Sequence, residues 1–213
     1  MTPTRDDLAR LSELGVATVY EASGREGLVD APLIQLVPGS RAAGPARTVL
    51  CGQDDNLMVH AVIERIQPGE VLVLSMPEPR PAALIGELLA TQVKVRGAAA
   101  ILADAACRDV EELARLGLPI WTRYVRAKGT TKAKIGELDA TVTVGGTVIA
   151  PGDIVVLDAD GAVCIKRERA EQVLTAAEAR FEREAAVRKK LVAGQTSYDL
   201  HGLRDVVERD RKG

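Results

Sequence analysis

The chain has 213 residues and an ordinary globular composition, with 46% hydrophobic and 27% charged residues. This composition excludes an intrinsically disordered chain, and the length allows one large domain or two small ones. The formal net charge is −2 and aromatic residues make up only 2% of the chain. Because it offers neither a basic surface for phosphates nor stacking platforms for bases, we expect no nucleic-acid partner.

The three cysteines, Cys51, Cys107 and Cys164, lie far apart and have no Cys-x-x-Cys spacing. This pattern argues against a disulfide framework and against a thiolate zinc site, so we expect reduced, buried thiols. Acidic residues occupy the N-terminal segment 1–7, where a secretory signal would need an apolar run. No stretch approaches the roughly 18 apolar residues of a membrane span, so we expect a cytoplasmic protein without a membrane partner.

The first expected elements are a helix and a region of broken strands. Residues 4–14 predict a short helix, because Thr4 can cap it, Asp7 follows three residues later and leucines recur on one face. Gly15 interrupts this helix. Residues 34–50 mix proline and glycine with valine and leucine, which is typical of strands broken by turns.

In the middle of the chain, apolar runs alternate with helical patterns. Residues 56–66 predict a helix, and the run of valine and leucine at 71–74 predicts a fully buried strand. A proline-rich loop at 76–81 leads to a helix over 86–97, which is followed by another buried strand at 98–102. Such alternation implies a parallel α/β layer.

The pattern changes toward the C-terminus. Residues 109–116 predict a short helix, and 118–121 predict a third apolar strand. Residues 136–165 alternate threonine and valine between glycine-containing turns, which is typical of antiparallel hairpins. A long helix over about 168–193 has one apolar side and packs either on a neighbouring subunit or on its own domain.

Common nucleotide-binding and hydrolase motifs are missing. The sequence has no Gly-x-Gly-x-x-Gly, no Gly-x-x-x-x-Gly-Lys-Ser/Thr and no Gly-x-Ser-x-Gly. Its two histidines, His60 and His201, are too few for a multi-histidine metal centre within one chain. A bound metal would therefore be a hard cation, Mg²⁺ or Mn²⁺, held by oxygen ligands.

Charged residues gather in segment 104–112, just beyond the strand expected at 98–102, where α/β proteins place ligands. Two interpretations are open. Asp109 can cap the next helix with Glu112 as its capping-box partner, which leaves Arg108 on the surface. Alternatively, Arg108 offers a planar fork for a carboxylate, and Asp109 offers an oxygen ligand for a cation.

A second candidate is the start of the helix at Gly86. The backbone N–H groups of Leu88 and Leu89 would be among its unpaired donors, and such a terminus binds anions. The alternative is that both leucines are ordinary core residues and that Glu87 complements the helix dipole. Spacing alone does not decide between these interpretations.

These motifs together resemble one protein family. The likeness rests on the following residues and runs: Glu87, Arg108, Asp109 and Glu112, with 86–90 and 52–57. Their spacing is similar to that of the 4-hydroxy-4-methyl-2-oxoglutarate/4-carboxy-4-hydroxy-2-oxoadipate aldolase family, which shares its fold with the regulator of ribonuclease activity A. The likeness runs from about Gly15 to the end of the long helix and so covers most of the chain.

The resemblance implies a single RraA-like domain over residues 1–213 with the β/β/α swivelling fold: mixed sheets, a parallel βα middle, antiparallel C-terminal hairpins and a long C-terminal helix. It implies a pyruvate-specific class II aldolase that also decarboxylates oxaloacetate. The expected assembly is a homotrimer or a hexamer, with sites between subunits.

The resemblance also implies roles for individual residues. Asp109 resembles the protein ligand to Mg²⁺ or Mn²⁺, and Arg108 resembles the residue that holds the pyruvyl group. At the helix start that Gly86 opens, the amides of Leu88 and Leu89 would bind the substrate carboxylate. Both reactions leave the enolate of pyruvate, whose charge a divalent cation and Arg108 would stabilise in a water-poor cleft.

The aldol reaction also needs a base for the 4-hydroxyl proton. The family carries an acid on the C-terminal helix of the neighbouring subunit, and Glu184 is the residue here that we match to it. A proton relay through water to Glu87 or to this neighbouring acid is expected.

The loop at 76–81 departs from the family, whose members carry a glycine-rich turn there. Three prolines stiffen it, and Arg80 adds a cation that either reads a distal carboxylate or faces solvent. We expect His60 to be a satisfied core or interface histidine and Cys107 a packed thiol. A Schiff-base aldolase ranks below the metal mechanism, although four lysines could serve it: Lys94, Lys128, Lys132 and Lys134.

Two other functions remain open. The chain could be a non-catalytic protein regulator of a ribonuclease, because fold alone does not separate the two activities. It could also be an aldolase for sugar acids on the same scaffold. Asp109 and Glu112 favour catalysis, since a regulator has no need of a metal-binding acid beside an arginine.

Overall fold

A computed structural model of the chain describes residues 3–210, so the first two residues of the acidic N-terminal segment lie outside it. Helix α1 (Arg5–Ala22) begins with the expected capping box between Thr4 and Asp7. At Gly15 the backbone leaves the helical region, with φ 80° and ψ 166°, and kinks the helix. The predicted interruption is therefore confirmed.

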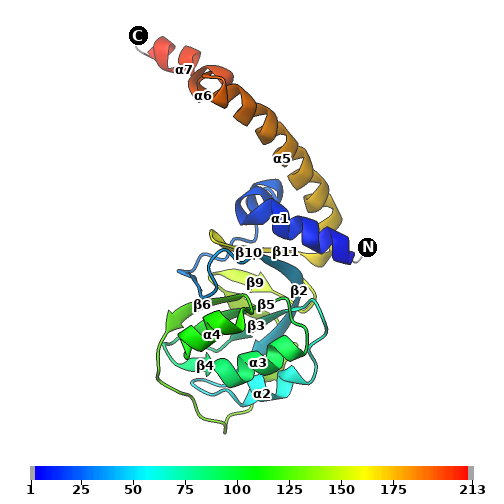
Figure 1. Cartoon of the computed structure of the whole chain (residues 1–213), viewed down its shortest axis with the longest axis vertical. Helices are drawn as coiled ribbons and strands as arrows, with labels where there is room; N and C mark the ends of the chain where they lie inside the picture. The colour runs from blue at the N-terminus through cyan, green and yellow to red at the C-terminus, as the bar shows by residue number, and fades with distance from the viewer. Residues whose placement is uncertain (1–2, 211–213) are drawn as a thin grey trace.

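One mixed sheet forms the centre of the molecule (Figure 1). Its strands follow in the order β1 (Ile34–Gln35), β6 (Ile120–Val125), β5 (Ala100–Cys107), β3 (Val71–Ser75), β2 (Ala42–Leu50), β10 (Ile154–Asp158) and β11 (Gly161–Ile165). Strands β2, β3, β5 and β6 are parallel, while β10 pairs antiparallel with β2 and β11. The predicted parallel middle and antiparallel C-terminal part are confirmed.

Short strands complete this arrangement. Strand β4 (Ala83–Ile85) adds to β5 in parallel, and β7 (Glu137–Leu138) adds to β2. A separate hairpin of β8 (Val142–Val144) and β9 (Thr147–Ile149) packs through its buried side chains on the opposite sheet face from α2, α3 and α4.

Three helices cover one face of the parallel strands: α2 (Leu57–Ile63), α3 (Glu87–Val95) and α4 (Val110–Leu116). Their buried side chains share a core with alternate residues of β3 and β5, such as Leu72, Leu74 and Ile101. Because the strands are covered on both faces, their sequences read as continuous apolar runs.

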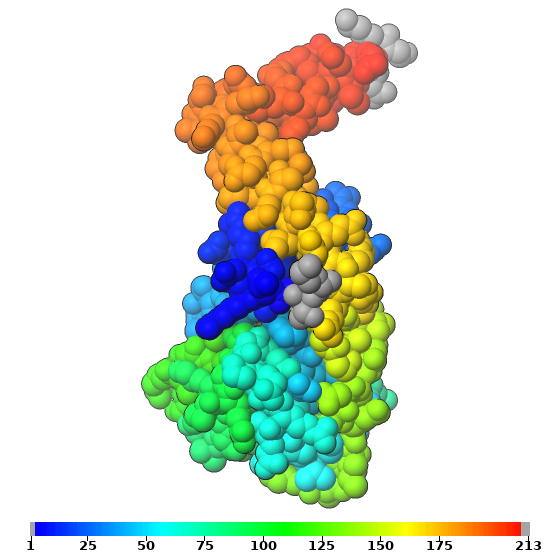
Figure 2. All heavy atoms as spheres, turned by 90° about the vertical axis from the view of Figure 1, so that its right-hand side faces the viewer, coloured from blue at the N-terminus to red at the C-terminus, as the bar shows by residue number. Residues whose placement is uncertain are grey.

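The ends of the chain form a separate layer. After a 3₁₀ turn (Arg167–Arg169), helix α5 (Ala170–Val192) packs with α1 over β10 and β11, where Leu11, Val173 and Ala177 are buried. Beyond this contact α5 projects from the body and continues into α6 (Ser197–Leu200) and α7 (Leu203–Asp210), as Figures 1 and 2 show. Within residues 3–210, no helix combines the length and apolar content of a membrane span.

Two element predictions were wrong in detail, and one strand was missed. Strand β5 does not stop at residue 102 but continues to Cys107, so the start of segment 104–112 is inside the sheet. There, Asp104 is buried and pairs with Arg123 of β6. Strand β4 was not predicted, and the helix expected over 56–66 ends at Ile63.

Candidate functional site

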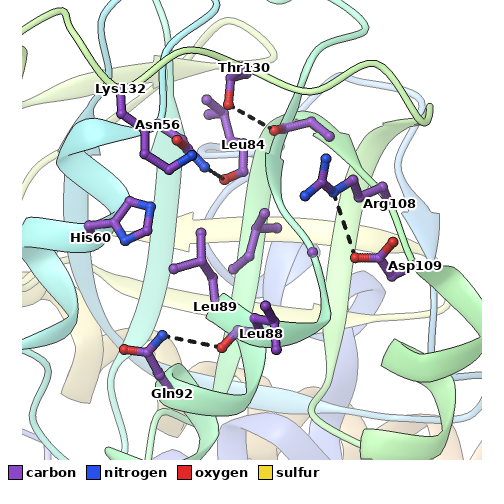
Figure 3. Close-up of a pocket in the computed structure, with 13 residues that line it drawn as sticks. Asn56, His60, Leu84, Leu88, Leu89, Gln92, Arg108, Asp109, Thr130 and Lys132 are labelled. Atoms are coloured by element: carbon purple, nitrogen blue, oxygen red, sulfur yellow. Dashed lines mark hydrogen bonds and ion pairs between the residues drawn. The ribbon is translucent and has the colours of Figure 1, made fainter.

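A pocket of about 280 Å³ opens where α2, β4 and the starts of α3 and α4 meet (Figure 3). Strand β4 supplies part of its wall through Ala83, Leu84 and Ile85, all of them buried. Arg108 and Asp109 line the side at the end of β5, so the structure brings this pair together with the start of α3. The pocket thus lies at the carboxyl ends of parallel strands, as expected for a ligand site of an α/β protein.

The conformation of Asp109 aims its carboxylate at α3. Asp109 precedes α4 in the left-handed region, with φ 59° and ψ 45°, and makes no side-chain cap to that helix. Instead its Oδ2 accepts a hydrogen bond from the Glu87 N–H at 3.2 Å and lies 3.7 Å from the Arg108 Nε. The capping interpretation was therefore wrong: Asp109 does not cap α4, and Glu112 pairs with Arg115 at 3.3 Å.

Gly86 is required by this packing. A Cβ at position 86 would lie 2.4 Å from the Asp109 Oδ2 and 3.1 Å from the Arg108 Cγ. The Gly86 φ of −138° is open to any residue, so the need for glycine comes from the two side chains above it. Gly86 and the Arg108–Asp109 pair therefore form one packed unit.

The start of α3 offers two free amides to the pocket. The Glu87 N–H is taken by Asp109, and the structure gives no acceptor for the N–H groups of Leu88 and Leu89 among residues 3–210. The Leu88 side chain is 76% exposed, so it is no core residue, whereas Leu89 is buried. Unpaired amides and the helix dipole together favour an anion at this position.

The opposite wall carries polar side chains from α2 and from the segment after β6 (Figure 3). Asn56 donates from Nδ2 to the Leu84 carbonyl at 3.1 Å, while its buried Oδ1 has no hydrogen-bond partner among the described residues. His60 lines this wall and is exposed, so it is not the core histidine that was one of the two expectations; the other, an interface histidine, stays a prediction. Lys132 lines it as well.

Comparison with known proteins places this chain in a family. A model of RraA-like proteins, described as Aldolase/RraA, matches residues 16–164. The chain belongs to the Aldolase/RraA family. The family resemblance inferred from the spacing of Glu87, Arg108 and Asp109 is thereby confirmed, and so is the fold class.

Members of the Aldolase/RraA family carry different names. A protein of Halalkalibacterium halodurans named "Putative 4-hydroxy-4-methyl-2-oxoglutarate aldolase" is 34% identical over 134 residues, which is 63% of this chain and 64% of that protein. The chain therefore matches slightly less than two thirds of this relative's length.

Two solved structures are of proteins named as regulators. Streptomyces coelicolor RraAS2, "an unusual member of the RNase ES inhibitor RraA protein family", is 27% identical, with a TM-score of 0.75 over 88% of this chain and 98% of that one. The "RNA-processing inhibitor RraA" of Thermus thermophilis is 28% identical, with a TM-score of 0.59 over 65% of this chain and 82% of that one. The family thus includes both aldolase-named proteins and ribonuclease inhibitors.

Two of the acids proposed from the family resemblance lie outside the pocket of their own chain. The Glu87 carboxylate accepts a hydrogen bond from the Thr91 hydroxyl at 3.1 Å and is not among the residues that line the pocket, while the Glu87 N–H donates to Asp109. Glu184 lies on α5 and pairs with Arg180 at 2.8 Å. Arg80 is also outside the pocket and pairs with Glu78 and Asp54.

The donor set suits a divalent cation bound by one protein carboxylate. Among residues 3–210, no three His, Cys, Asp or Glu side chains gather as a metal centre. The Asp109 side chain is 44% exposed, and its Oδ1 accepts no hydrogen bond from the described residues. Mg²⁺ keeps several waters and accepts such a site, so Asp109 fits the cation that the family resemblance implies.

The cysteines and lysines considered as catalytic nucleophiles fit that role less well than Asp109 fits the role of cation ligand. Burial raises the pKa of the Cys107 thiol to about 12, which a hydrogen bond with Thr122 only partly offsets, and the predicted packed thiol is confirmed. All three cysteines are buried and unpaired. Of the lysines considered for a Schiff base, Lys132 lines the pocket, but its side chain is exposed rather than desolvated.

Proposed function

We propose that this member of the Aldolase/RraA family is a divalent-metal-dependent carbon–carbon lyase. Its substrates would be 4-hydroxy-2-oxo acids, which it cleaves to pyruvate, and oxaloacetate, which it decarboxylates. The observation that carries the proposal is the meeting of Arg108, the Asp109 carboxylate and the free amides of α3 in one pocket.

The α3 side of the pocket fits the oxo-acid part of such a substrate. A carboxylate at the helix start would accept hydrogen bonds from the amides of Leu88 and Leu89. Arg108 is 50% exposed and makes one contact of 3.7 Å with Asp109, so its guanidinium can reach a second substrate oxygen. These contacts would orient the bond between C3 and C4 for cleavage.

Both reactions leave an electron pair on C3 of the pyruvyl group, and the resulting enolate carries negative charge on the 2-oxo oxygen. Arg108 would stabilise that charge with a charge-assisted hydrogen bond. A divalent cation at Asp109, when bound, supplies Lewis-acid withdrawal of the same charge. Aldol cleavage and decarboxylation therefore both require a site that stabilises the negative charge of the enolate.

The 4-hydroxyl proton needs an acceptor in the aldol reaction only. The Glu87 carboxylate accepts a hydrogen bond from Thr91 and is not among the residues that line the pocket, so we propose Glu184 of the partner subunit in a trimer or hexamer for this role. On the opposite wall, Lys132 and His60 would meet the part of the substrate beyond C4.

The second candidate is regulation of a ribonuclease through surface contacts. The names of the two solved relatives favour it. Regulation through surface contacts does not require the Asp109 carboxylate to lie over Gly86. We therefore rank the lyase first.

The test is pyruvate formation from oxaloacetate and from 4-hydroxy-4-methyl-2-oxoglutarate, with Mg²⁺ or Mn²⁺ and with EDTA. We expect metal-dependent turnover that falls about 100-fold or more in Asp109→Asn, which keeps the side-chain shape but loses the charge. Glu112→Gln is the matched control, because this acid pairs with Arg115 outside the pocket. Absence of metal-dependent turnover on both substrates, with inhibition of a ribonuclease instead, would establish the second candidate.

A further inference from the structure

Asp55 is a fully buried carboxylate that forms no ion pair with the described residues. Its Oδ1 accepts from the Leu57 N–H at 2.8 Å. Its Oδ2 accepts from the Thr131 hydroxyl at 2.6 Å and from the N–H groups of Ala133 at 2.7 Å and Lys134 at 3.1 Å. A charge without a cation partner is stable in the interior only because all these donors converge on it.

The donors come from two segments that are far apart in the sequence. Leu57 begins α2, whereas the other three donors belong to segment 131–134 after β6. Backbone hydrogen bonds join the same segments: the Asn56 N–H donates to the Thr131 carbonyl at 3.0 Å, and the Thr131 N–H to the Asp54 carbonyl at 3.1 Å. Asp55 therefore fastens segment 131–134 to the start of α2.

Lys132 belongs to the segment that Asp55 holds by these hydrogen bonds. The residues on either side of it, Thr131 and Ala133, both donate to the Asp55 Oδ2. The nearby Lys134 ammonium is held by the Gln53 carbonyl at 2.7 Å, whereas Lys132 makes no side-chain hydrogen bond with the described residues and lines the pocket. In Figure 3, Lys132 and Asn56 lie together on the wall away from Arg108.

We propose that Asp55 is a positioning residue of the proposed lyase. It fixes the backbone of segment 131–134 so that the Lys132 ammonium contacts the part of the substrate beyond C4. The inference rests on the proposed function for its substrate and on the Asp55 hydrogen bonds for its geometry. Asp55 does not touch the substrate; it acts through Lys132.

The charge state of Asp55 supports this role. Burial alone would raise the pKa of Asp55, but the hydrogen bonds from Thr131 and from the amides of Ala133, Leu57 and Lys134 outweigh burial and lower the pKa below its usual range. The carboxylate is thus ionised at neutral pH and accepts all its donors at once.

The first experiment measures amide hydrogen exchange without reference to activity. Asp55→Asn leaves one uncharged acceptor oxygen, so an NH₂ group faces either the Leu57 N–H or the donors of segment 131–134, and the charge that strengthens these hydrogen bonds is lost. Exchange at Ala133 and Lys134 should therefore rise about tenfold or more over wild type. Thr131→Val, which removes one donor, should raise exchange less, and Thr131→Ser should restore it. Unchanged exchange at these two amides in both Asp55→Asn and Thr131→Val would overturn the inference. If Asp55→Asn does not fold, the comparison of exchange in Thr131→Val and Thr131→Ser is the test.

The second experiment asks whether Asp55 acts through Lys132. We expect Asp55→Asn to raise the KM for 4-hydroxy-4-methyl-2-oxoglutarate, whose distal carboxylate lies beyond C4, about tenfold with a smaller change in kcat. The inhibition constant of oxalate should change less than about twofold, because oxalate would occupy only the Arg108 end. In a Lys132→Met background the same substitution should change KM less than about twofold. An equal effect of Asp55→Asn in both backgrounds would show a merely structural role.

The lyase activity and the positioning role of Asp55 can be disproved independently of each other. If the wild type turns over no oxo acid, the lyase proposal falls, and the same cycle is then measured on the binding of 4-hydroxy-4-methyl-2-oxoglutarate by calorimetry. Loss of the coupling between positions 55 and 132 in that binding cycle overturns the positioning role, while its persistence supports it.

Discussion

Asp109 has a left-handed backbone, with φ 59° and ψ 45°, at the position before a helix where an extended backbone is usual for a capping residue. In the usual conformation its carboxylate would bond to the first amides of α4. The left-handed turn places it over Gly86 instead, where it bonds to the Glu87 N–H. A strained non-glycine residue of this kind costs on the order of 1 kcal/mol and is common at functional sites.

Gly86→Ala tests this packing at the residue scale. The new methyl would collide with the Asp109 carboxylate but leave an allowed backbone. We expect lyase activity to fall at least about tenfold, while the free energy of unfolding in urea changes by less than about 1 kcal/mol.

Gly117→Ala is the matched control, and we expect the reverse result. Gly117 ends α4 at φ 70°, and a Cβ added there would have no atom within 4 Å. Alanine at this position should destabilise the fold by about 1 kcal/mol and leave activity unchanged. Equal losses of activity in the two variants would contradict the account of Gly86.

The lowered pKa of Asp55 predicts how stability depends on pH. A carboxylate with a lowered folded pKa contributes stability fully above its unfolded pKa of about 3.9, and the contribution is lost as pH falls through the folded value. We expect Asp55→Asn to be less stable than wild type by about 2–3 kcal/mol at pH 7. The difference should shrink in urea unfolding experiments below about pH 4, and a difference that grows on acidification would contradict this.

At the scale of elements, the sequence predicted the buried strands of the parallel middle well, because a strand covered on both faces is a continuous apolar run. Strand β4 was missed, since three residues between a proline-rich loop and Gly86 carry no periodicity. The length of β5 was underestimated because Asp104 reads as the end of an apolar run, whereas Arg123 on the neighbouring strand pairs with it inside the sheet. Pairing between strands is not visible in a single segment.

The candidate site was predicted in part for the same reason. Arg108, Asp109 and the start of α3 could be found because their signal is local: a helix start and adjacent charges. Lys132 and His60 come from segments that only the fold brings to the pocket. Asp55 was overlooked because three of its four donors belong to segment 131–134, which only the tertiary fold brings to it.

Helix α5 allows a prediction about its two halves. Val173 is buried against the layer of α1, β10 and β11, whereas Leu191 near the other end is 39% exposed. We expect Val173→Ala to lower the free energy of unfolding by about 2 kcal/mol and Leu191→Ala by less than about 0.5 kcal/mol. Urea unfolding checks both; a large effect at position 191 would reveal a packing partner for that half.

At the scale of the whole molecule, α5 projects from the end of the body that carries β10 and β11, away from α2 and α3 at the pocket (Figure 1). The Glu184 carboxylate therefore does not line the pocket of its own chain. It pairs with Arg180 on α5 instead. If Glu184 is part of the site, it must reach the pocket of another subunit.

Mixed oligomers test this arrangement. Asp109→Asn and Glu184→Gln should each be inactive alone on the 4-hydroxy-2-oxo acid, but subunits refolded together should regain activity at sites that combine one intact residue from each chain. Refolded mixtures of Asp109→Asn with wild type serve as the reference. Mixtures that stay inactive would remove Glu184 from the site and leave the Arg108–Asp109 pair untouched.

A crystal structure of the protein soaked with Mg²⁺ and pyruvate is the most direct measurement of the central claim. We expect the pyruvate carboxylate to bind the amides of Leu88 and Leu89, the Arg108 guanidinium to contact the pyruvate, and the ion to bind the Asp109 carboxylate. Pyruvate bound elsewhere, or an ion held by other carboxylates while the pocket stays without ligand, would contradict it.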